Sequence, residues 1–530
     1  MFFKDLLLFF LLVQSLILIF SEKNASGQIV SQDRIFPDAW QNAGSTIDTS
    51  LQQLVINVRD FGATGNGKIN DYPAVDSAIS SLKGVGGVIF FPEGTYLIKS
   101  PLNIPSGVVL RGEFPKKSLL IFDFVGDAIK IFGKNVNNWT PLILPSDMHS
   151  DRISVSNPNL FSVGGYAVIR QANDPSWNIK DRWAEYSAGQ IINITDIKGN
   201  ILFLERPLRH NYSLKRNPEI GPFIPNERSG VENLKIERRI SGTNRERDNK
   251  HTIHFYCASN GWVKGVHSYK AFGSHIAITN STKVEVTGCF FDDACEYDTG
   301  GSGGGVRVQS RSGECLIENN IFRKLRHSIL LQSGANGNVF GYNYSCETRS
   351  SSHPNFAGDI SLHGNYPYAN LFEGNIVEHI WIDRSHKGRN GPFNTFFRNR
   401  AEKCGFNMSD HKADNQNIIG NELFGGNILS KMAVGNGYRL AGKGHFTYGN
   451  NTIAGGLQPA KTKDLTDYSY YLNSNPEEIP EKPEWWTIPD AFPVIGPPHP
   501  LKPLKNNPAR ARYIANKPIP CLNNPTESKK

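Results

Sequence analysis

The sequence is short of the features that mark metal clusters and nucleic-acid binding. Seven of its 530 residues are cysteines, and none of them forms the CxxC spacing of a zinc site. The odd count leaves at least one cysteine unpaired within the chain, and we expect most of them to be small buried apolar side chains. A disulfide between Cys289 and Cys315 is the alternative in an oxidising compartment. No block of Lys and Arg alone accompanies the net charge of +8, so nucleic acid is not the expected partner.

Long apolar runs are also scarce, and the clearest one lies at the N-terminus. It extends from Leu6 to Phe20, follows Lys4, and precedes small and polar residues from Ser21 to Gly27. The run is shorter than the roughly 20 residues of a membrane-spanning helix, and its flanks have the order of a secretion signal. We therefore expect residues 1–27 to be a signal peptide, with an uncleaved anchor as the alternative. The mature protein is expected to be secreted, periplasmic or at the cell surface, without stable membrane insertion.

What the chain does contain is glycine, proline and a repeating asparagine. There are 50 glycines and 31 prolines, a composition that favours short strands and tight turns. Six segments aligned on a late asparagine place Asn320, Asn343, Asn375, Asn399, Asn421 and Asn450 at separations of 23, 32, 24, 22 and 29 residues. A period near 23 predicts a β-solenoid in which these side chains stack as a ladder. Leucine-rich repeats have similar periods, but their leucine spacing is absent.

The N-terminal part of the predicted solenoid carries a distinctive segment. A helix is predicted over Pro73–Leu82, with Asp71 as its N-cap, and the strand Val88–Phe91 follows. Around them stand the segments "DFGATGNGKIND", "FPEGTYLI" and "VVLRGE". Their order resembles the pectate-lyase superfamily, in particular its rhamnogalacturonase/epimerase-like members, although Tyr72 stands where that family often has a second Asp. The resemblance implies an all-β fold, a right-handed parallel β-helix whose N-terminal end is capped by the helix.

The remaining segments differ in character from the repeat. Residues 28–54 are expected to be an irregular lead-in, and residues 55–456 the β-helix. Within the helix, residues 140–229 contain hairpin-like strands and predict a β excursion or small subdomain that walls a substrate cleft. Residues 457–530 are rich in proline and predict an extended tail laid along the helix, with a disordered tail as the alternative.

Polar and ionisable side chains recur ahead of the repeating asparagine, where each preceding strand ends. Because stacked coils lie about 4.8 Å apart, equivalent positions form a row on one face. We predict that this row lines one solvent-facing groove across three successive coils, an ordinary polar outer face being the alternative. The predicted catalytic residues are His363, Asp383, Arg384, His386 and Lys387. The predicted substrate-binding residues are Gln332, Arg389, His411 and Arg439.

These residue types suit elimination on a uronic-acid unit of a polysaccharide. Lys387, or a histidine at 363 or 386, fits a base that removes the C5 proton, and Arg384 and Arg389 fit the carboxylate. The resemblance implies Lys or Arg as the usual base of superfamily lyases, often with calcium. Epimerisation begins with the same proton abstraction, so lyase and epimerase both stay open. We expect a monomer that acts on an acidic glycan.

Two other functions remain open on the same fold. A glycoside hydrolase needs paired carboxylates, for which Asp292, Asp293 and Asp298 are the candidates. The same residues with Glu296 could hold Ca²⁺, although a charged, glycine-flanked surface loop is the favoured explanation. A metal site at His363, Asp383 and His411 is a weaker alternative, so the metal stays undecided. The third function is glycan binding without catalysis.

Overall fold

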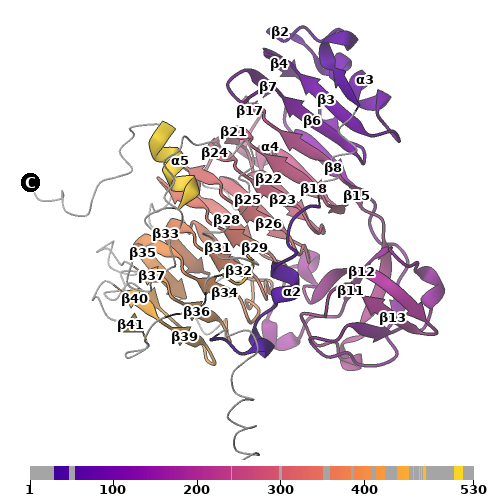
Figure 1. Ribbon diagram of the computed structural model, residues 1–530, viewed down its shortest axis with the longest axis vertical. Helices are drawn as coiled ribbons and strands as arrows, with labels where there is room; N and C mark the ends of the chain where they lie inside the picture. The colour runs from indigo at the N-terminus through magenta and orange to yellow at the C-terminus, as the bar shows by residue number, and fades with distance from the viewer. Residues whose placement is uncertain are drawn as a thin grey trace, which may run out of the picture.

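The chain forms a right-handed parallel β-helix, seen in the computed structural model as a stack of coils with an antiparallel lobe on one side (Figure 1). The all-β fold inferred from the repeat is therefore confirmed. The structure describes residues 29–46, 54–239, 242–297, 301–349, 358–383, 387–408, 413–423, 438–452, 457–458, 465, 467, 469–472 and 507–516. The predicted signal peptide, 1–27, lies outside these residues.

Three parallel faces build the helix, and the first is a single sheet of short strands. In spatial order it contains β1 (Val55–Asn57), β3 (Gly87–Phe91), β6 (Val108–Gly112), β16 (Gly230–Glu232), β20 (Trp262–Lys264), β23 (Glu285–Thr287), β26 (Leu316–Glu318), β29 (Val339–Gly341), β32 (Leu371–Glu373), β34 (Thr395–Phe397), β36 (Asn417–Ile419) and β39 (Phe446–Tyr448).

The second and third faces join into one bent sheet, because β33 and β35 run through the bend. The second face contains β2 (Asn66–Asn70), β4 (Gly94–Ile98), β7 (Ser118–Phe122), β17 (Lys235–Arg238), β21 (His267–Ala271), β24 (Phe290–Ala294), β27 (Ile321–Arg323), β30 (Tyr344–Cys346), β33 (Ile376–Ile382), β35 (Arg400–Met408), β37 (Glu422–Leu423), β40 (Asn450–Thr452) and the antiparallel β41 (Leu457–Gln458). The third face contains β5 (Leu102–Asn103), β8 (Ile129–Phe132), β18 (Ile253–Tyr256), β22 (Ser274–Thr279), β25 (Gly304–Gln309), β28 (His327–Leu331), β31 (Ile360–Leu362), the later halves of β33 and β35, and β38 (Tyr438–Arg439).

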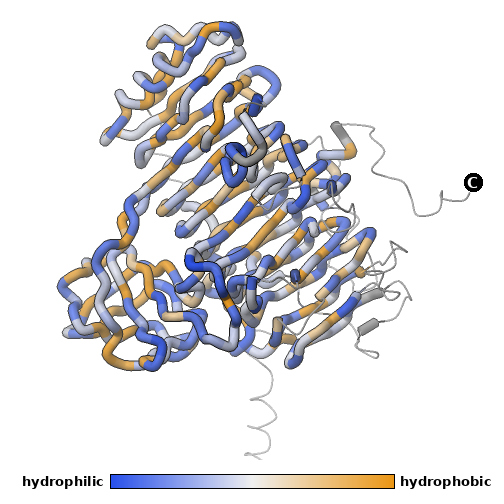
Figure 2. The backbone as a smooth tube through the Cα atoms, turned by 180° about the vertical axis from the view of Figure 1, so that it is seen from behind, coloured by the Kyte–Doolittle hydropathy of each residue, from blue (hydrophilic) through white to orange (hydrophobic). Residues whose placement is uncertain are grey.

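Apolar and polar residues alternate along these strands (Figure 2), and the apolar side chains form the buried core. Within the helix, Phe340, Phe372 and Phe396 of three successive coils are fully buried and stack with ring centroids 5.0 and 4.7 Å apart. Helix α3 (Tyr72–Ser81) covers the N-terminal end with its buried Val75, Ala78 and Ile79, close to the predicted span. Asp71 does not cap it, because its carboxylate accepts hydrogen bonds from Thr64 and Gly65 instead.

The predicted asparagine ladder is confirmed. In each pair from Asn320 to Asn450, the side-chain amide of one asparagine donates to the side-chain oxygen of the next at 2.8–3.0 Å. The same oxygen also accepts the backbone N–H of the preceding asparagine, as Asn421 does from Asn399 at 2.9 Å. A second, parallel ladder runs through Asn338, Asn370 and Asn394 to Gln416. Insertions between coils therefore leave the stacking of the turns unchanged.

The expectation that most cysteines are buried and unpaired holds for those in the described part of the chain, but the alternative disulfide is wrong. Cys289 and Cys315 are free and fully buried. The Cys289 thiol lies 3.3 Å from the Thr287 carbonyl, and that of Cys315 lies 3.4 Å from the Gly313 carbonyl. Both residues stand where later coils have ladder asparagines, since their backbone N–H groups donate to Asn320 and Asn338.

The excursion is an antiparallel sheet inserted between β8 and β16. Its strands, in spatial order, are β10 (Arg152–Ser154), β13 (Ile201–Leu204), β12 (Gly189–Lys198), β11 (Tyr166–Arg170), β14 (Glu219–Phe223) and β9 (Thr140–Pro141). It docks on the turns that follow the third face, where Arg209 donates to Asn336 at 2.7 Å and to Glu314 at 2.9 Å. Trp177 stacks on Tyr366 at 3.5 Å.

The segments before and after the helix pack along its sides. The lead-in, with the short helix α2 (Pro37–Trp40), crosses the coils, and the Trp40 indole donates to the Ala369 carbonyl at 3.0 Å. Helix α5 (Pro508–Asn516) lies on the outside of the ladder turns, where Asn507 donates to the carbonyls of Asn343 and Gly374. This part of the predicted extended tail is thus helical, and residues 473–506 lie outside the described part. No helix in the described ranges has the length and apolarity needed to cross a membrane.

We predict that Asn399→Ala destabilises the coils, because it leaves polar groups of Phe372 and Asn375 buried without partners. The free energy of unfolding in urea should fall by roughly 3 kcal/mol. Asn200→Ala, at an exposed turn of the excursion, is the matched control and should change stability little. Equal stability of both variants would contradict a structural role for the ladder.

Candidate functional site

A row of outward side chains follows the third face at the point where each strand ends. The backbone register places Phe132, Tyr256, Thr279 and Gln309 at equivalent positions of successive coils, and it continues to Gln332, His363 and Asp383. Hydrogen bonds connect neighbouring residues in the middle of this row. Gln332 donates to Gln309 at 2.7 Å, and Gln309 donates to the Thr279 hydroxyl at 3.2 Å. We call these seven residues the outer row.

Two of the predicted catalytic residues meet in this row. His363 and Asp383 follow β31 and β33 in neighbouring coils, and Nδ1 of His363 lies 2.6 Å from Oδ2 of Asp383. Their side chains are 20% and 22% exposed, so solvent or a ligand can reach both. The two atoms are in close contact, but their geometry is not that of an aligned hydrogen bond. A carboxylate in this position stabilises an imidazole that takes up a proton.

The excursion contributes the neighbouring wall of the row. The Lys387 ammonium lies 3.7 Å from the Asp181 carboxylate and 5.7 Å from the centre of the Trp183 ring. Asn365 also donates to Asp181 at 3.0 Å, and the Trp183 side chain is 49% exposed. Lys387 and Trp183 therefore bring a cation and an accessible aromatic ring to the His363 end of the row.

The other predicted site residues are placed differently. Gln332 belongs to the outer row, whereas Arg389 lies beyond it and pairs with Asp414 at 3.2 Å. Arg439 is exposed but stands in the adjacent row, in register with Asn407. Arg384, His386 and His411 lie outside the described residues.

Sequence reasoning missed His327 and Arg326, which lie at the start of β28. The His327 ring centre is 6.2 Å from that of His363, and its Nδ1 lies 3.0 Å from the Gly358 carbonyl. Burial, followed by the charge of Arg326, lowers the pKa of His327 to about 3. His327 is thus a neutral ring beside His363. Counting back only to the ends of strands overlooked His327, because it is the first residue of its strand.

The carboxylates proposed for a hydrolase or for calcium are held by other side chains. Both oxygens of Asp292 accept hydrogen bonds from Arg323 at 2.7 Å, and Asp293 accepts one from the Tyr297 hydroxyl. Asp298 lies outside the described residues. A carboxylate bound by a guanidinium fork is poorly suited as a general acid, because the fork stabilises its ionised form.

A second His–Asp pair, also missed from the sequence, lies near the other end of the row. Nδ1 of His254 is 2.8 Å from Oδ2 of Asp127, and the His251 backbone N–H donates to Oδ1 at 2.7 Å. Burial opposes ionisation of Asp127, but the hydrogen bond from His254 and the nearby His251 lower its pKa to about 2. The sequence feature that could have revealed this pair is the HxxH pattern over residues 251–254. Its acidic partner, Asp127, lies one coil earlier.

These three residues have the composition of a metal site, with ligand atoms within 4.8 Å of one another. Their proton arrangement fits a metal poorly. The Ser274 backbone N–H donates to Nδ1 of His251 at 3.2 Å, so the neutral ring carries its proton on Nε2 and offers no free lone pair there. Arg307 and Lys250 also act on His251, and Arg238 on Asp127, so positive charge already surrounds the cluster.

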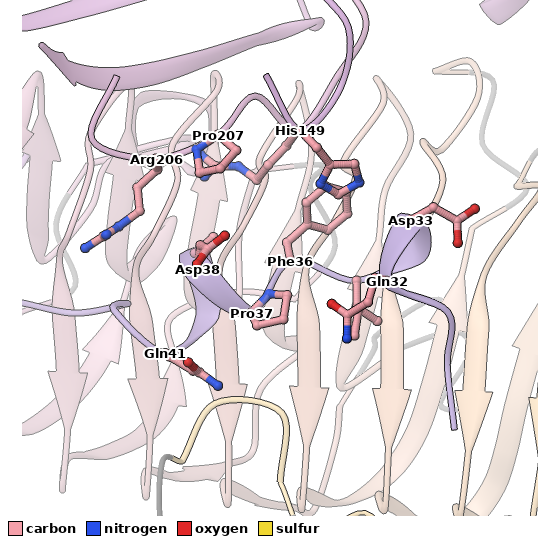
Figure 3. A pocket seen from close by; sticks show the side chains of 12 residues that line it. Gln32, Asp33, Phe36, Pro37, Asp38, Gln41, His149, Arg206 and Pro207 are labelled. Carbon is pink, nitrogen blue, oxygen red and sulfur yellow. The ribbon is translucent and has the colours of Figure 1, made fainter. Parts of the chain in front are cut away.

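A cavity of about 520 Å³ lies apart from the outer row, between the lead-in and the excursion (Figure 3). Phe36 and His149 stack there with ring centres 5.3 Å apart. Arg209, which also lines it, is committed to Glu314. None of the described predicted site residues lines this cavity, whereas His363 and Asp383 of the outer row have Nδ1 and Oδ2 2.6 Å apart.

Comparison with known proteins agrees with the fold. Residues 55–138 match the family model described as rhamnogalacturonase A/epimerase, pectate lyase-like. The fold is that of a pectate-lyase-like β-helix. The tailspike gp61 of Pseudomonas phage phi297 superposes on this β-helix with a TM-score of 0.53 at 10% identity, covering 74% of this chain and 73% of that chain. At this identity the likeness concerns the fold alone.

Relatives with curated descriptions match only segments of this β-helix. Alpha-1,3-galactosidase A of Peterkaempfera griseoplana is 26% identical over 195 residues, 34% of this chain and 24% of that protein. Plasmin and fibronectin-binding protein A of Streptococcus pneumoniae is 35% identical over 107 residues, 20% of this chain and 13% of that protein. The chain therefore spans a quarter or less of the length of these two relatives.

Asp127→Asn tests the second His–Asp pair. Because the pKa of Asp127 is lowered from 3.8 to about 2, its ionised form stabilises the folded chain above pH 3.8, and this stabilisation is lost as the pH falls to about 2. The wild type should be more stable than the variant by about 2 kcal/mol near neutral pH, measured by urea denaturation, and this difference should shrink in acid. Asp123→Asn, at the partly exposed pair with Arg239, should change stability little. A difference that stays constant into acid would contradict the assignment.

Proposed function

We propose that this β-helix is a secreted carbohydrate-active enzyme that abstracts a proton from uronic-acid units of an acidic polysaccharide, as a lyase or an epimerase. The observation that carries the proposal is the His363–Asp383 contact of 2.6 Å on an accessible strand end. An imidazole beside a carboxylate is a general base whose charged form is stabilised after it takes a proton.

In the elimination reaction, His363 removes the C5 proton of a uronate unit. The electron pair of that C–H bond forms the C4–C5 double bond, and the C4–O4 bond breaks with its pair going to O4, which then takes up a proton. Asp383 is a positioning residue that holds the imidazole and balances its charge. Lys387 supplies the cation for the substrate carboxylate, because its carbonyl accepts the backbone N–H of Asn365, two residues after His363.

Charge supports an acidic substrate. The chain carries a net charge of +8, and Arg326, Lys387 and Arg307 stand near the outer row or just beneath it. Such a field raises the local concentration of an anionic polymer. Epimerisation shares the first step and differs only in returning the proton to the other face of C5, so product analysis separates the two reactions.

The alternative functions are less well supported by the side chains present. A hydrolase would need two carboxylates able to exchange protons, whereas Asp292 is held by Arg323. Glycan binding without catalysis would use the same row and differ from our proposal only in the absence of turnover.

We expect His363→Ala to lower turnover of polygalacturonate or alginate by about 10²-fold or more, the usual scale of a lost acid–base group. Absorbance of the unsaturated product measures elimination, and NMR of the polymer measures epimerisation. Lys387→Ala should raise KM and lower kcat, since its cation meets the carboxylate before and during the reaction. His267→Ala, whose ring stacks on Phe290 of the second face, is the matched histidine control. Full activity of a folded His363→Ala variant would exclude the His363–Asp383 pair as the catalytic site.

A further inference from the structure

The outer row ends, at its N-terminal side, in an exposed aromatic cluster. Phe132 closes β8 and is 41% exposed, whereas Ile129 and Ile131 of the same strand are buried in the core. Its ring centre lies 5.0 Å from that of His254 and 5.5 Å from that of Tyr256. The Lys130 ammonium lies 6.0 Å from the Phe132 ring. Single exposed aromatics are common, but three clustered rings with a cation at one strand end form a defined surface.

The cluster is held rigidly from below. Asp127 fixes Nδ1 of His254, and the Thr279 hydroxyl lies 3.1 Å from its Nε2. Both ring nitrogens are therefore engaged, and the His254 ring meets Phe132 edge-on at 85°. Tyr256, in turn, packs against apolar residues at the base of the excursion. A surface fixed in this way loses little conformational entropy when a ligand binds.

The cluster is continuous with the proposed catalytic pair. From Phe132 the outer row passes through Tyr256, Thr279, Gln309 and Gln332 to His363, five steps between coils. At about 4.8 Å per step, Phe132 lies roughly 24 Å from His363. The residues between them offer the hydroxyl and amide groups of Thr279, Gln309 and Gln332, which can exchange hydrogen bonds with sugar hydroxyls.

We infer that Phe132, Tyr256, His254 and Lys130 form a distal binding subsite for a uronic-acid unit of the same polymer chain whose reacting unit lies at His363. The inference rests on the proposed function and specifies its substrate as a long chain lying along the helix axis. The polarised C–H groups of a sugar ring stack on the electron-rich face of an aromatic ring, and Lys130 meets the uronate carboxylate. A disaccharide at His363 is too short to reach this subsite.

The test compares long and short substrates. Phe132→Ala should weaken binding of polygalacturonate or alginate about 3- to 10-fold, the range expected for a lost aromatic contact, and raise KM for the polymer equally. Its kcat at saturation and its kcat/KM on the corresponding disaccharide or trisaccharide should equal those of the wild type. Lys130→Ala should act in the same way and reduce the salt dependence of polymer binding. Phe132→Tyr should retain binding, because the ring is kept.

Phe114→Ala provides the control, since Phe114 is 60% exposed but lies between β6 and β7, outside the outer row. Circular dichroism and thermal unfolding establish that each variant folds. If Phe132→Ala keeps the wild-type KM on polymer while His363→Ala loses turnover, the distal subsite is wrong and the proposed function stands. If the wild type neither binds nor converts any uronan, both are overturned.

Discussion

The structure depends on asparagine side chains that hold each coil at the spacing of the next. Asn399 illustrates how completely the amide is used. Its Nδ2 donates to the Phe372 carbonyl and to the Asn421 side chain, while its Oδ1 accepts from the backbone and the side chain of Asn375. A buried amide with every partner satisfied tolerates no shift of one coil against another, because any shift leaves polar groups unpaired. The two ladders therefore fix the register of the coils from Asn320 to Asn450, and with it the position of the outward residues on those coils.

Because this register is constant, residues that are far apart in the sequence become neighbours on one surface. Because the ladder absorbs insertions between coils, His363 and Asp383 come within 2.6 Å although they belong to different coils. The outer row is a product of the same constraint, since one residue per coil reaches the same place. A site built on such strands is rigid before any ligand binds, and this suits the proton abstraction that we propose, which depends on a short and constant distance between the base and the carbon.

The excursion adds what a bare solenoid lacks, a second surface at an angle to the row. It is anchored by Arg209, whose ion pair with Glu314 is almost fully buried. The desolvation of such a pair offsets much of its attraction, so its main effect is to fix one docking position. Docked in this way, the excursion brings Asp181 and Trp183 beside Lys387 and also lines the cavity at Phe36 with His149 and Arg206.

The sequence by itself determined the coils, their stacking and the identity of one row, because a repeat with one asparagine per coil fixes which residues are equivalent. Counting alone gave the ladder from Asn320 to Asn450 and grouped His363 with Asp383 in one groove, whereas their contact of 2.6 Å came from the tertiary structure. Only the tertiary structure decided which side chains touch across unequal segments. His254 contacts Asp127, which lies 127 residues earlier in the sequence. Lys387 pairs with Asp181 of the inserted sheet. His327, at the start of its strand, lies close to His363. A repeat specifies the position of a residue in its coil, but side-chain direction depends on bends and insertions that have no period.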